Sequence, residues 1–476
     1  MNPRRPSRLA LRDRLLASSG PQERFISDEA TRVAVRGLPS TVVLPPGSDP
    51  ASGRSVLLAA DTQLTCALAL IELDGVARRI VICPPDLADD HLPAVLESGD
   101  IDLILSSGSL PRSLGRPLLR LSRSPQSGVP KRSDDPLATE WVLFTSGTTG
   151  GEPKMVVHTL DSLSSHLPSG PLAGPGPVWS TFYDIRRYGG MQVFLRACLG
   201  GGSLILSSAS EPSAAFLARA GLCGVSHILG TPSHWRRAIM TGQAHAIRPS
   251  YVRLSGEVAD QAILTRLQQL YPDAIVAHAF ASTEAGVGFE VRDGLEGFPA
   301  DLVGNSGVGT AIAIVDGSLR LRSGASAAGY LNRNPKSFLD DGGFVDTGDL
   351  VELRGDRYHF TGRKEGLINV GGNKVYPEEI EAIINQHPDV VISRVKGRRN
   401  PITGSVVTAD VVPRPVFLSC RAGTAPVDAL SGQVRLRHEI LDFCRAKLSA
   451  YKVPATVTFV DSIALSPAGK LVRSIA

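Results

Sequence analysis

Between Ser55 and Ala281, short apolar segments alternate with stretches of helical periodicity. Apolar runs of this kind indicate strands buried on both faces, and their alternation with helices predicts mostly parallel sheets covered by helices. Ligands bind beyond the carboxyl ends of the strands in such sheets, so the loops there are the candidate site. The clearest helix is residues 261–272, with Ile263, Leu264, Leu267, Leu270 and Tyr271 on one face. The predicted strands are residues 55–60, 79–83, 102–107, 141–146, 203–208, 225–230, 251–256 and 274–280.

The pattern changes after about Gly304, where short polar strands and turns take over. Beyond Arg363 a smaller α+β unit begins, with Pro377 near the first position of a helix. This unit is predicted to contain helices over 377–388 and 436–448 and strands over 390–395, 405–412 and 456–461. The pattern therefore divides the chain into a large domain, residues 1–362, and a small domain, residues 363–476.

Composition agrees with a multidomain globular protein. The 476 residues predict about three compact units, because a single core stops growing near ~250–300 residues. The 48 glycines and 34 prolines exceed their usual shares, which predicts a loop-rich chain. The net charge of +4 is too balanced to indicate a surface that coats nucleic acid.

Cysteine usage and apolar run lengths bear on location. The six cysteines include no C-x-x-C pair, which favours buried thiols in a reducing compartment over a zinc site or a disulfide framework. No apolar run reaches ~18 residues, so no membrane span is predicted. The Arg-rich start lacks a secretory apolar core, and a frayed or helical start is favoured over a transit peptide. We predict a cytoplasmic protein.

The strongest local motif runs from Phe144 to Lys154, FTSGTTGGEPK. A strand leads into hydroxyls and glycines and then a lysine. Glycines let backbone N–H groups approach a polyphosphate, hydroxyls add donors, and lysine adds a mobile charge. No Gly-x4-Gly-Lys-Ser/Thr frame is present, so it is not a Walker A loop. A Ser/Thr/Gly turn without any ligand is the alternative.

Two carboxylates lie in further motifs. Glu284 follows Ser282 and Thr283 at a predicted strand end, where it can hold Mg²⁺ or, alternatively, belong to the first turn of a helix. Asp349, in FVDTGDL, can accept both hydroxyls of a ribose, although Thr-Gly-Asp is also a common turn. Lys470 lies on a glycine-containing C-terminal tail, where a lysine is ordinarily just solvated.

Together and in order, five segments resemble the ANL superfamily of adenylate-forming enzymes, the AMP-binding family that includes acyl- and aryl-CoA ligases. They are TSGTTG with the following Pro-Lys, STE, TGD, GRKEGLINVGGNKVYPEEIE, and SPAGKLVR. The resemblance spans most of the chain, from about Ser55 onward. It implies an α/β fold with a large N-terminal region of mostly parallel sheets, a distorted β subdomain, and a small mobile α+β C-terminal domain.

The resemblance also implies roles for individual residues. Lys470, Glu284 and Thr145 match catalytic positions, Glu284 as the Mg²⁺ ligand, and Glu365 matches the hinge of the small domain. Gly371 and Gly372 match the loop that faces the thiol tunnel. The positions that match ATP-binding residues are Thr145, Ser146, Gly147, Thr148, Thr149, Gly150, Lys154, Gly256, Glu257, Ser282, Thr283, Glu284, Asp349, Arg363 and Lys470.

The implied activity joins a carboxylic acid to AMP with ATP and Mg²⁺, releases pyrophosphate, and transfers the acyl group to a thiol, coenzyme A in a CoA ligase. A stand-alone enzyme that loads a carrier protein is one alternative, and an inactive nucleotide-binding regulator is another. A small-molecule acid is the expected partner, with no nucleic acid and no membrane span.

The segment after the phosphate loop frames the acyl pocket in many relatives. Arg187, Tyr188 and Gly189 match it, and His234 lies in a second candidate segment. Arg187 or its neighbour Arg186 can pair with an acidic group of the substrate, although a structural arginine pair is the favoured alternative. The phosphate loop also departs from the family pattern, because two residues rather than one separate Gly150 from the Pro-Lys pair.

Overall fold

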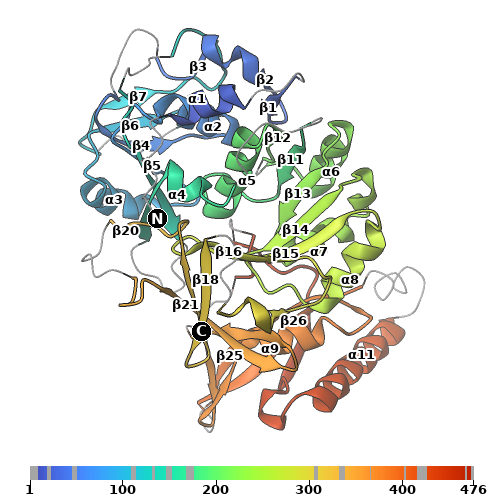
Figure 1. The fold of residues 1–476 in the computed structure, drawn as a ribbon. Coiled ribbons are helices and arrows are strands. Elements are labelled where there is room, and N and C mark those ends of the chain that lie inside the picture. Colours follow the sequence, from blue (N-terminus) through green and yellow to red (C-terminus); the bar gives the residue numbers. More distant parts are fainter. Residues whose placement is uncertain are drawn as a thin grey trace.

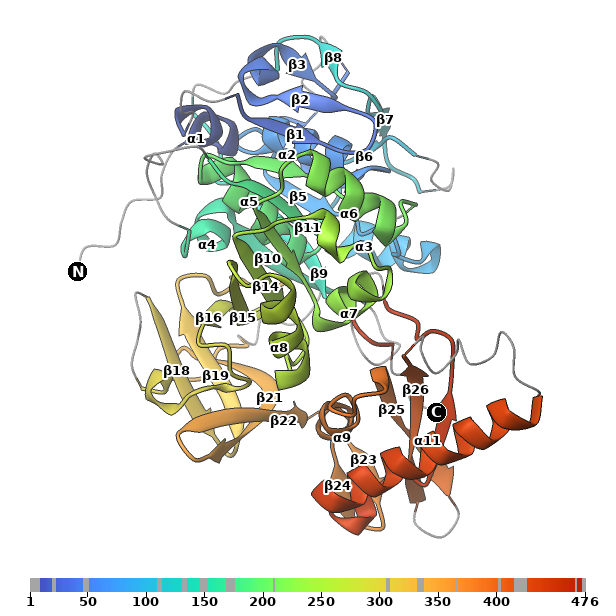
Figure 2. The ribbon, with the colours of Figure 1, turned by 90° about the vertical axis from the view of Figure 1, so that its right-hand side faces the viewer.

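The computed structural model describes most of the chain. The described residues are 9–18, 23–45, 51–108, 114–130, 135–145, 153–167, 176–208, 210–304, 309–331, 338–364, 366–400, 404–414, 426–466 and 469–472, with backbone alone at 404 and 426–431. The chain forms two large sheets with their helices, a smaller antiparallel sheet, and a C-terminal domain at the end of the molecule farthest from β3 (Thr41–Val42) (Figures 1 and 2).

A seven-stranded sheet carries the first four predicted strands. Its strands β4, β5, β6, β7 and β9 are parallel, while β10 and β20 add on antiparallel. In spatial order the strands are β20 (Gly329–Tyr330), β10 (Lys154–Thr159), β9 (Glu140–Thr145), β5 (Arg79–Ile82), β4 (Ser55–Ala59), β6 (Leu103–Ser106) and β7 (Leu118–Arg120). The accompanying helices are α2 (Gln63–Leu73), α3 (Leu92–Ser98) and α4 (Leu160–Ser164).

An eight-stranded sheet carries the other four predicted strands. It is parallel except at its two edges, where β16 and β2 pair antiparallel. The order is β16 (Gly286–Val291), β15 (Ile275–Ser282), β14 (Tyr251–Ser255), β13 (His227–Gly230), β11 (Val178–Thr181), β12 (Ser203–Ile205), β1 (Phe25–Ser27) and β2 (Arg32–Ala34). Its helices are α5 (Tyr188–Leu199), α6 (Ser213–Leu222), α7 (Pro232–Met240) and α8 (Gln261–Leu270). The prediction of parallel, helix-covered sheets is confirmed.

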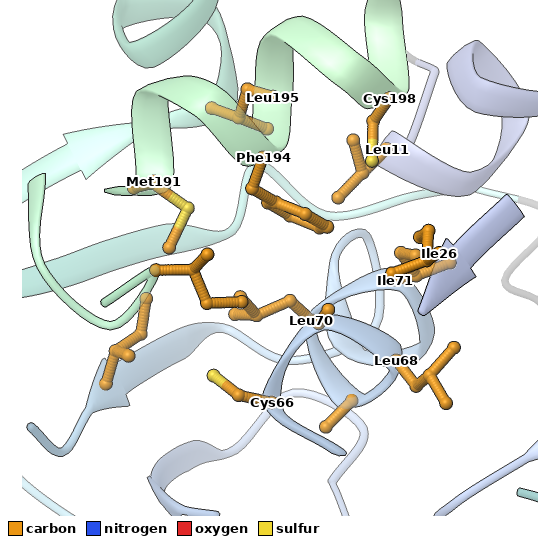
Figure 3. Close-up of a cluster of buried hydrophobic side chains, with 14 of the residues drawn as sticks. Leu11, Ile26, Cys66, Leu68, Leu70, Ile71, Met191, Phe194, Leu195 and Cys198 are labelled. Atoms are coloured by element: carbon orange, nitrogen blue, oxygen red, sulfur yellow. The ribbon is translucent and has the colours of Figure 1, made fainter. Parts of the chain in front are cut away.

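The largest apolar core joins these two sheets. On α5, Met191, Phe194 and Cys198 gather with Cys66 and Leu70 of α2, and α1 (Leu11–Ala17) adds a leucine from the start of the chain (Figure 3). Full burial of such a side chain contributes about 1.5–3 kcal/mol. One core therefore fixes α5 against both sheets, and the helical start is confirmed.

The polar strands after Gly304 form an antiparallel five-stranded sheet. Its order is β17 (Phe298–Pro299), β22 (Arg357–Arg363), β21 (Val345–Arg354), β19 (Ser318–Ser323) and β18 (Thr310–Val315). A turn at Gly355 and Asp356 joins β21 to β22, with Gly355 at a φ of +64°. A further two-stranded sheet pairs β3 with β8 (Gln126–Ser127), and 3-10 helices lie at Val35–Ser40, Asp89–His91, Ala244–Ala246, Ala300–Leu302 and Ala450–Lys452.

The C-terminal unit has its own core. Helices α9 (Pro377–Ile384) and α11 (Pro426–Lys447) accompany the sheet β25 (Val390–Asn400), β26 (Gly404–Pro413) and β27 (Thr456–Phe459), and β23 (Ile368–Val370) pairs with β24 (Asn373–Val375). The helix predicted over 377–388 ends at Ile384, and the one predicted from 436 begins at Pro426. No helix among the described residues is both long and apolar enough to span a bilayer.

Candidate active site

The segment that carries Lys470 forms a tight loop. Leu465 and Leu471 form a β-bridge, and the Ser466 N–H donates to the Lys470 carbonyl at 2.7 Å. Gly469 closes the turn, donating its N–H to the Ser466 carbonyl at 2.7 Å with a φ of +71°. Side chains are disfavoured at that φ, so glycine suits the position before the lysine.

This loop lies directly on the large domain. The Thr231 hydroxyl donates a 2.6 Å hydrogen bond to the Gly469 carbonyl. The imidazole of His234 lies so close to Gly469 that an added Cβ would be 1.7 Å from its Cε1 atom. A Cβ at Gly256, just after β14, would be 3.4 Å from Lys470 Cε. Lys470 therefore extends along the carboxyl end of β14, where the strand–helix pattern predicted a ligand site.

Glu257 fastens the loop from the other side. Its Oε1 accepts a 2.8 Å hydrogen bond from the Leu471 N–H, and its Oε2 accepts a 3.0 Å bond from the Ser233 N–H in the first turn of α7. A carboxylate at a helix N-terminus is favoured by the helix dipole. One carboxylate thus connects the large domain to the residue after Lys470.

The N-terminus of α7 is built to support this contact. Thr231 and His234 form a reciprocal capping box, with the His234 N–H donating to Thr231 Oγ1 at 3.0 Å and the Thr231 N–H donating to His234 Nδ1 at 3.2 Å. Burial, aided by the charge of Arg237, lowers the pKa of His234 to about 3. The ring is neutral at pH 7 and stacks on Phe182 at a centroid distance of 5.5 Å.

Four charged groups surround the Lys470 ammonium. Burial lowers its pKa, and the positive charge of Arg363 lowers it further, while Glu257, Asp349 and Glu284 oppose the shift. The structure therefore brings together residues from the SGE, STE, TGD, GRK and SPAGK segments, which span more than 200 positions of the chain. The arrangement is a cationic group held among carboxylates and a second cation.

Asp349 and Arg363 are cross-strand partners on β21 and β22. Arg363 donates from Nε to Asp349 Oδ1 at 2.9 Å and from a terminal nitrogen to Oδ2 at 3.2 Å. This is a bidentate pair. The Arg363 side chain is 45% exposed and that of Asp349 is 16% exposed, so both remain reachable from outside.

Glu284 follows β15, with one carboxylate oxygen engaged. Tyr330 on β20 donates its hydroxyl to Glu284 Oε1 at 3.0 Å. Lys154 Nζ lies 5.8 Å from the centre of the Tyr330 ring, so the lysine of the phosphate motif is near the Glu284 group. The described residues contain no cluster of three or more metal-binding side chains. A single half-buried carboxylate nevertheless fits Mg²⁺ that arrives with nucleotide phosphates, because Mg²⁺ uses one or two carboxylates plus phosphate oxygens.

A buried histidine supports the STE segment. His158 on β10 hydrogen bonds through Nε2 to the Thr283 carbonyl at 2.7 Å and through Nδ1 to Ser162 Oγ at 3.1 Å. Burial lowers the pKa of His158 to about 4, although the bond to Thr283 opposes the shift. The contacts of His158, Thr231 and Tyr330 were not predicted. Only Thr231 had a sequence signal, the helix-capping pattern T-P-S-H.

The phosphate motif is described only at its two ends. Thr145 ends β9, Lys154 begins β10, and the two residues pair across the strands. Ser146, Gly147, Thr148, Thr149 and Gly150 lie outside the described residues, as do the additional loop residues and the predicted hinge residue Glu365. Gly371 and Gly372 form the exposed turn between β23 and β24, with φ values of +59° and +87°.

The predicted acyl-pocket residues lie around the start of α5. Arg187 forms an ion pair with Asp86, and Gly189 lies against the Tyr183 ring, which an added Cβ would approach to 3.5 Å. Tyr188 is 6% exposed. The neighbouring Arg186 is engaged by Asp184 and by the Ala60 carbonyl, the latter at 2.7 Å. Both arginines thus have internal partners.

The overall architecture is that of an α/β enzyme with a separate C-terminal unit. The AMP-binding enzyme family matches residues 56–331, and the AMP-binding enzyme C-terminal domain matches residues 379–470. The chain belongs to the AMP-binding enzyme family, which confirms the resemblance to adenylate-forming enzymes.

Two similar proteins are named as CoA ligases. A medium/long-chain-fatty-acid–CoA/3-oxocholest-4-en-26-oate–CoA ligase of Mycobacterium tuberculosis is 39% identical over 124 residues, 26% of this chain and 20% of that ligase. The acyl-CoA ligase ppsA of Aspergillus oryzae is 29% identical over 369 residues, 71% of this chain and 62% of that protein. The first match therefore spans about a fifth of that relative's length, and the second spans less than two thirds.

A solved structure shows the same fold. The o-succinylbenzoate CoA synthetase of Bacillus subtilis, in complex with its acyl-adenylate intermediate, matches with a TM-score of 0.70 and 18% identity. The match covers 97% of this chain and 96% of that one. The predicted α/β class with a β-rich subdomain and a C-terminal domain is confirmed.

Proposed function

We propose that this protein uses ATP to convert a carboxylic acid into an acyl-adenylate and then transfers the acyl group to a thiol, that of coenzyme A. The observation that supports this proposal most directly is the contact of the Lys470 loop with Gly256 and Glu257. The charges of Asp349 and Glu284 also act on the Lys470 ammonium. The names of the similar CoA ligases also support it.

In this proposal the nucleotide lies along the carboxyl ends of β9, β14 and β15. Asp349 accepts the ribose hydroxyls beside Arg363, and Lys154 contacts the outer phosphates. The remaining residues proposed to bind ATP are Thr145, Ser146, Gly147, Thr148, Thr149, Gly150, Gly256, Glu257, Ser282 and Thr283. Glu284 holds Mg²⁺, which neutralises phosphate charge when it is bound.

The first chemical step is displacement at phosphorus. A carboxylate oxygen of the acid attacks the α-phosphorus of ATP, a new P–O bond forms, and the bond to pyrophosphate breaks. Lys470 lies between the acid and the α-phosphate, where its ammonium donates to oxygens of both and stabilises the charge that develops. Glu257, Asp349 and Glu284 favour the charged form of this ammonium and oppose the effect of burial, which lowers its pKa.

The Lys470→Ala variant tests this role. Pyrophosphate release from acid and ATP should fall by about 100-fold or more, the size of the loss of one charged donor at a reacting oxygen. Thioester formation from supplied acyl-adenylate should persist. Lys447→Ala, on the exposed end of α11, is the matched control. An equal loss in both half-reactions would contradict the role.

The second step requires the small domain, residues 363–476, to rotate. The thiol attacks the acyl carbonyl and AMP leaves with its oxygen. Glu365 is proposed as the hinge, and the Gly371-Gly372 turn as the part that lines the thiol path after rotation. In the described state the Lys470 loop lies on the large domain, which suits adenylation. Glu365→Pro should permit adenylation and block thioester formation, and equal rates of both steps would argue against the hinge.

The acceptor and the activity are decided by one assay. Aromatic, short-chain and fatty acids are tested for AMP release with coenzyme A, with a phosphopantetheinylated carrier protein, and with neither. Release that depends on coenzyme A supports the proposal, and release only with the carrier protein favours the loading enzyme. Absence of acid-dependent ATP–pyrophosphate exchange would favour an inactive regulator. A cytoplasmic location is part of the proposal, supported by the buried free thiols of Cys66, Cys198 and Cys444.

A further inference from the structure

Helix α5 carries a buried glutamine and a half-buried arginine beside its apolar face. Met191, Phe194 and Cys198 face the core (Figure 3), whereas Gln192 and Arg196 lie one helical turn apart on the adjacent face. Gln192 is 1% exposed. The Gln192 Oε1 and Arg196 Nε atoms are buried, and neither has a hydrogen-bond partner among the described residues. Buried polar atoms are almost always paired, so these two point to a missing partner.

A second arginine, which is buried, faces the same region from β14. Tyr251, Arg253 and Ser255 alternate along the strand and lie on one face. Arg253 is 2% exposed, its Nε also has no partner in the described part of the chain, and its terminal nitrogen lies 3.3 Å from Glu290 Oε2. An arginine so placed has donors left for another anion.

The region around Arg253 continues along β14 from the end of the strand that lies near Lys470. Ser255 is followed by Gly256, where an added Cβ would lie 3.4 Å from Lys470 Cε. Arg253 is two residues earlier on the same face, about 7 Å deeper at the rise of a strand. The neighbouring strand presents Ala277 and Ala279 there, in register with Arg253 and Ser255, and Ala281 follows two residues later. The side chains that this strand contributes are small, and an acyl group is proposed to lie along them.

The region carries excess positive charge. Burial, aided by the charge of Arg253, lowers the pKa of Arg196 to about 10. Burial also lowers the pKa of His166 to about 3, with contributions from Arg196 and Arg253. Both ring nitrogens of His166 are buried without a partner among the described residues. The three side chains therefore interact electrostatically.

Only one carboxylate is available to offset this charge among the described neighbours. Glu290 accepts hydrogen bonds from Tyr251 at 2.6 Å and from the exposed Arg292 at 2.6 Å, in addition to Arg253. Arg196 has no ion pair within the described ranges. A cation that is partly withdrawn from water without a counter-charge costs free energy, and an anionic ligand group would offset that cost.

We infer that the acid activated by this protein carries a second anionic group, a distal carboxylate, which binds Arg196 and Arg253 while the reacting carboxylate lies at Lys470. This inference rests on the proposed function and names its substrate class. The distal group gains two guanidinium donors, with the Gln192 amide and the neutral His166 beside it.

The test compares acids of equal length with one and two carboxylates: pentanoate with glutarate, hexanoate with adipate, and benzoate with isophthalate. ATP–pyrophosphate exchange should give kcat/KM at least about 100-fold higher for the better-fitting diacid, as expected for a desolvated charge pair. A preference for the monoacid in every pair would overturn the inference and leave the proposed function standing.

Two variants locate the preference. Arg196→Met should reduce the diacid preference to below about tenfold, mainly through KM, and leave the monoacid rates within about threefold. Arg196→Lys should retain part of the preference. The control is Arg266→Met, an exposed arginine on α8, which should change nothing. An unchanged preference in Arg196→Met would contradict the assignment.

Calorimetric binding of the same acids, with ATP present, separates the two proposals. Diacid binding that Arg196→Met abolishes, without exchange in the parent protein, would support the anion site and contradict adenylation. Neither binding nor exchange with any acid would overturn both proposals.

Discussion

The backbone N–H of Leu471 donates a 2.8 Å hydrogen bond to the carboxylate of Glu257, across 214 positions of the chain. The other oxygen of Glu257 accepts from the first turn of α7. Sequence resemblance places Glu257 among the ATP-binding residues, whereas its contacts here fasten the lysine loop to the large domain. The two roles of Glu257, nucleotide binding and attachment of the Lys470 loop, are compatible because the residue lies in the loop where β14 ends.

Glu257→Gln should weaken adenylation more than thioester formation. Glutamine keeps one acceptor oxygen and loses the charge, so one of the two hydrogen bonds is lost. Hydrogen bonds to charged groups contribute about 1.5–3 kcal/mol, so pyrophosphate release should fall by about tenfold or more. Thioester formation from supplied acyl-adenylate should change little. The control is Glu97→Gln, exposed on α3, and equal losses in both assays would count against the fastening role.

Gly469→Ala should reduce adenylation, as the loss of the Lys470 side chain is expected to do. The new Cβ would overlap the His234 ring, and the φ of +71° is unfavourable for alanine. The loop must then shift, and adenylation should fall by about tenfold or more because misplacement by ~1 Å can cost 100-fold. Gly355→Ala has a similar φ of +64° with no atom within 4 Å, so it reproduces the backbone strain alone. Unaltered adenylation in Gly469→Ala would show that the loop does not need this contact.

Asp349→Asn should raise the KM for ATP by about tenfold or more, because an amide accepts the two ribose hydroxyls less well than a carboxylate. The melting temperature should change little, since the pair with Arg363 is partly exposed and such pairs contribute about 0–1 kcal/mol. Glu352→Gln, exposed on the same strand and paired with Arg354, is the control. A normal KM with a lowered melting temperature would make Asp349 structural.

His158 should make the protein less stable in acid. Its pKa is about 4 when folded against 6.5 when exposed, so the unfolded state binds the extra proton between these values. Stability is complete above pH 6.5 and is lost as the pH falls, by about 2 kcal/mol at pH 5. His158→Gln, which keeps a donor for Thr283, should flatten the dependence of the unfolding free energy on pH between 6.5 and 5. An unchanged slope would contradict burial of the neutral ring.

Local patterns predicted the strands well, because a buried parallel strand must be apolar throughout and each of the eight predicted runs lies in one of the two large sheets. The end of α9 at Ile384 was less well predicted, since helix ends depend on how the last turn meets its neighbours. The division at residue 362 remains a prediction, as do the roles of Glu365 and the phosphate loop.

The sequence by itself determined the parallel sheets, the family, and the residue types at Lys470, Glu284, Asp349 and Arg363. These follow from local periodicity and from short motifs that keep their order. Only the tertiary structure decided that Glu257 holds the Lys470 loop, because that bond joins residues far apart in the chain. It also decided that the charges of Arg196 and Arg253 act on each other, since a single arginine in an apolar run has no local signal for its partners.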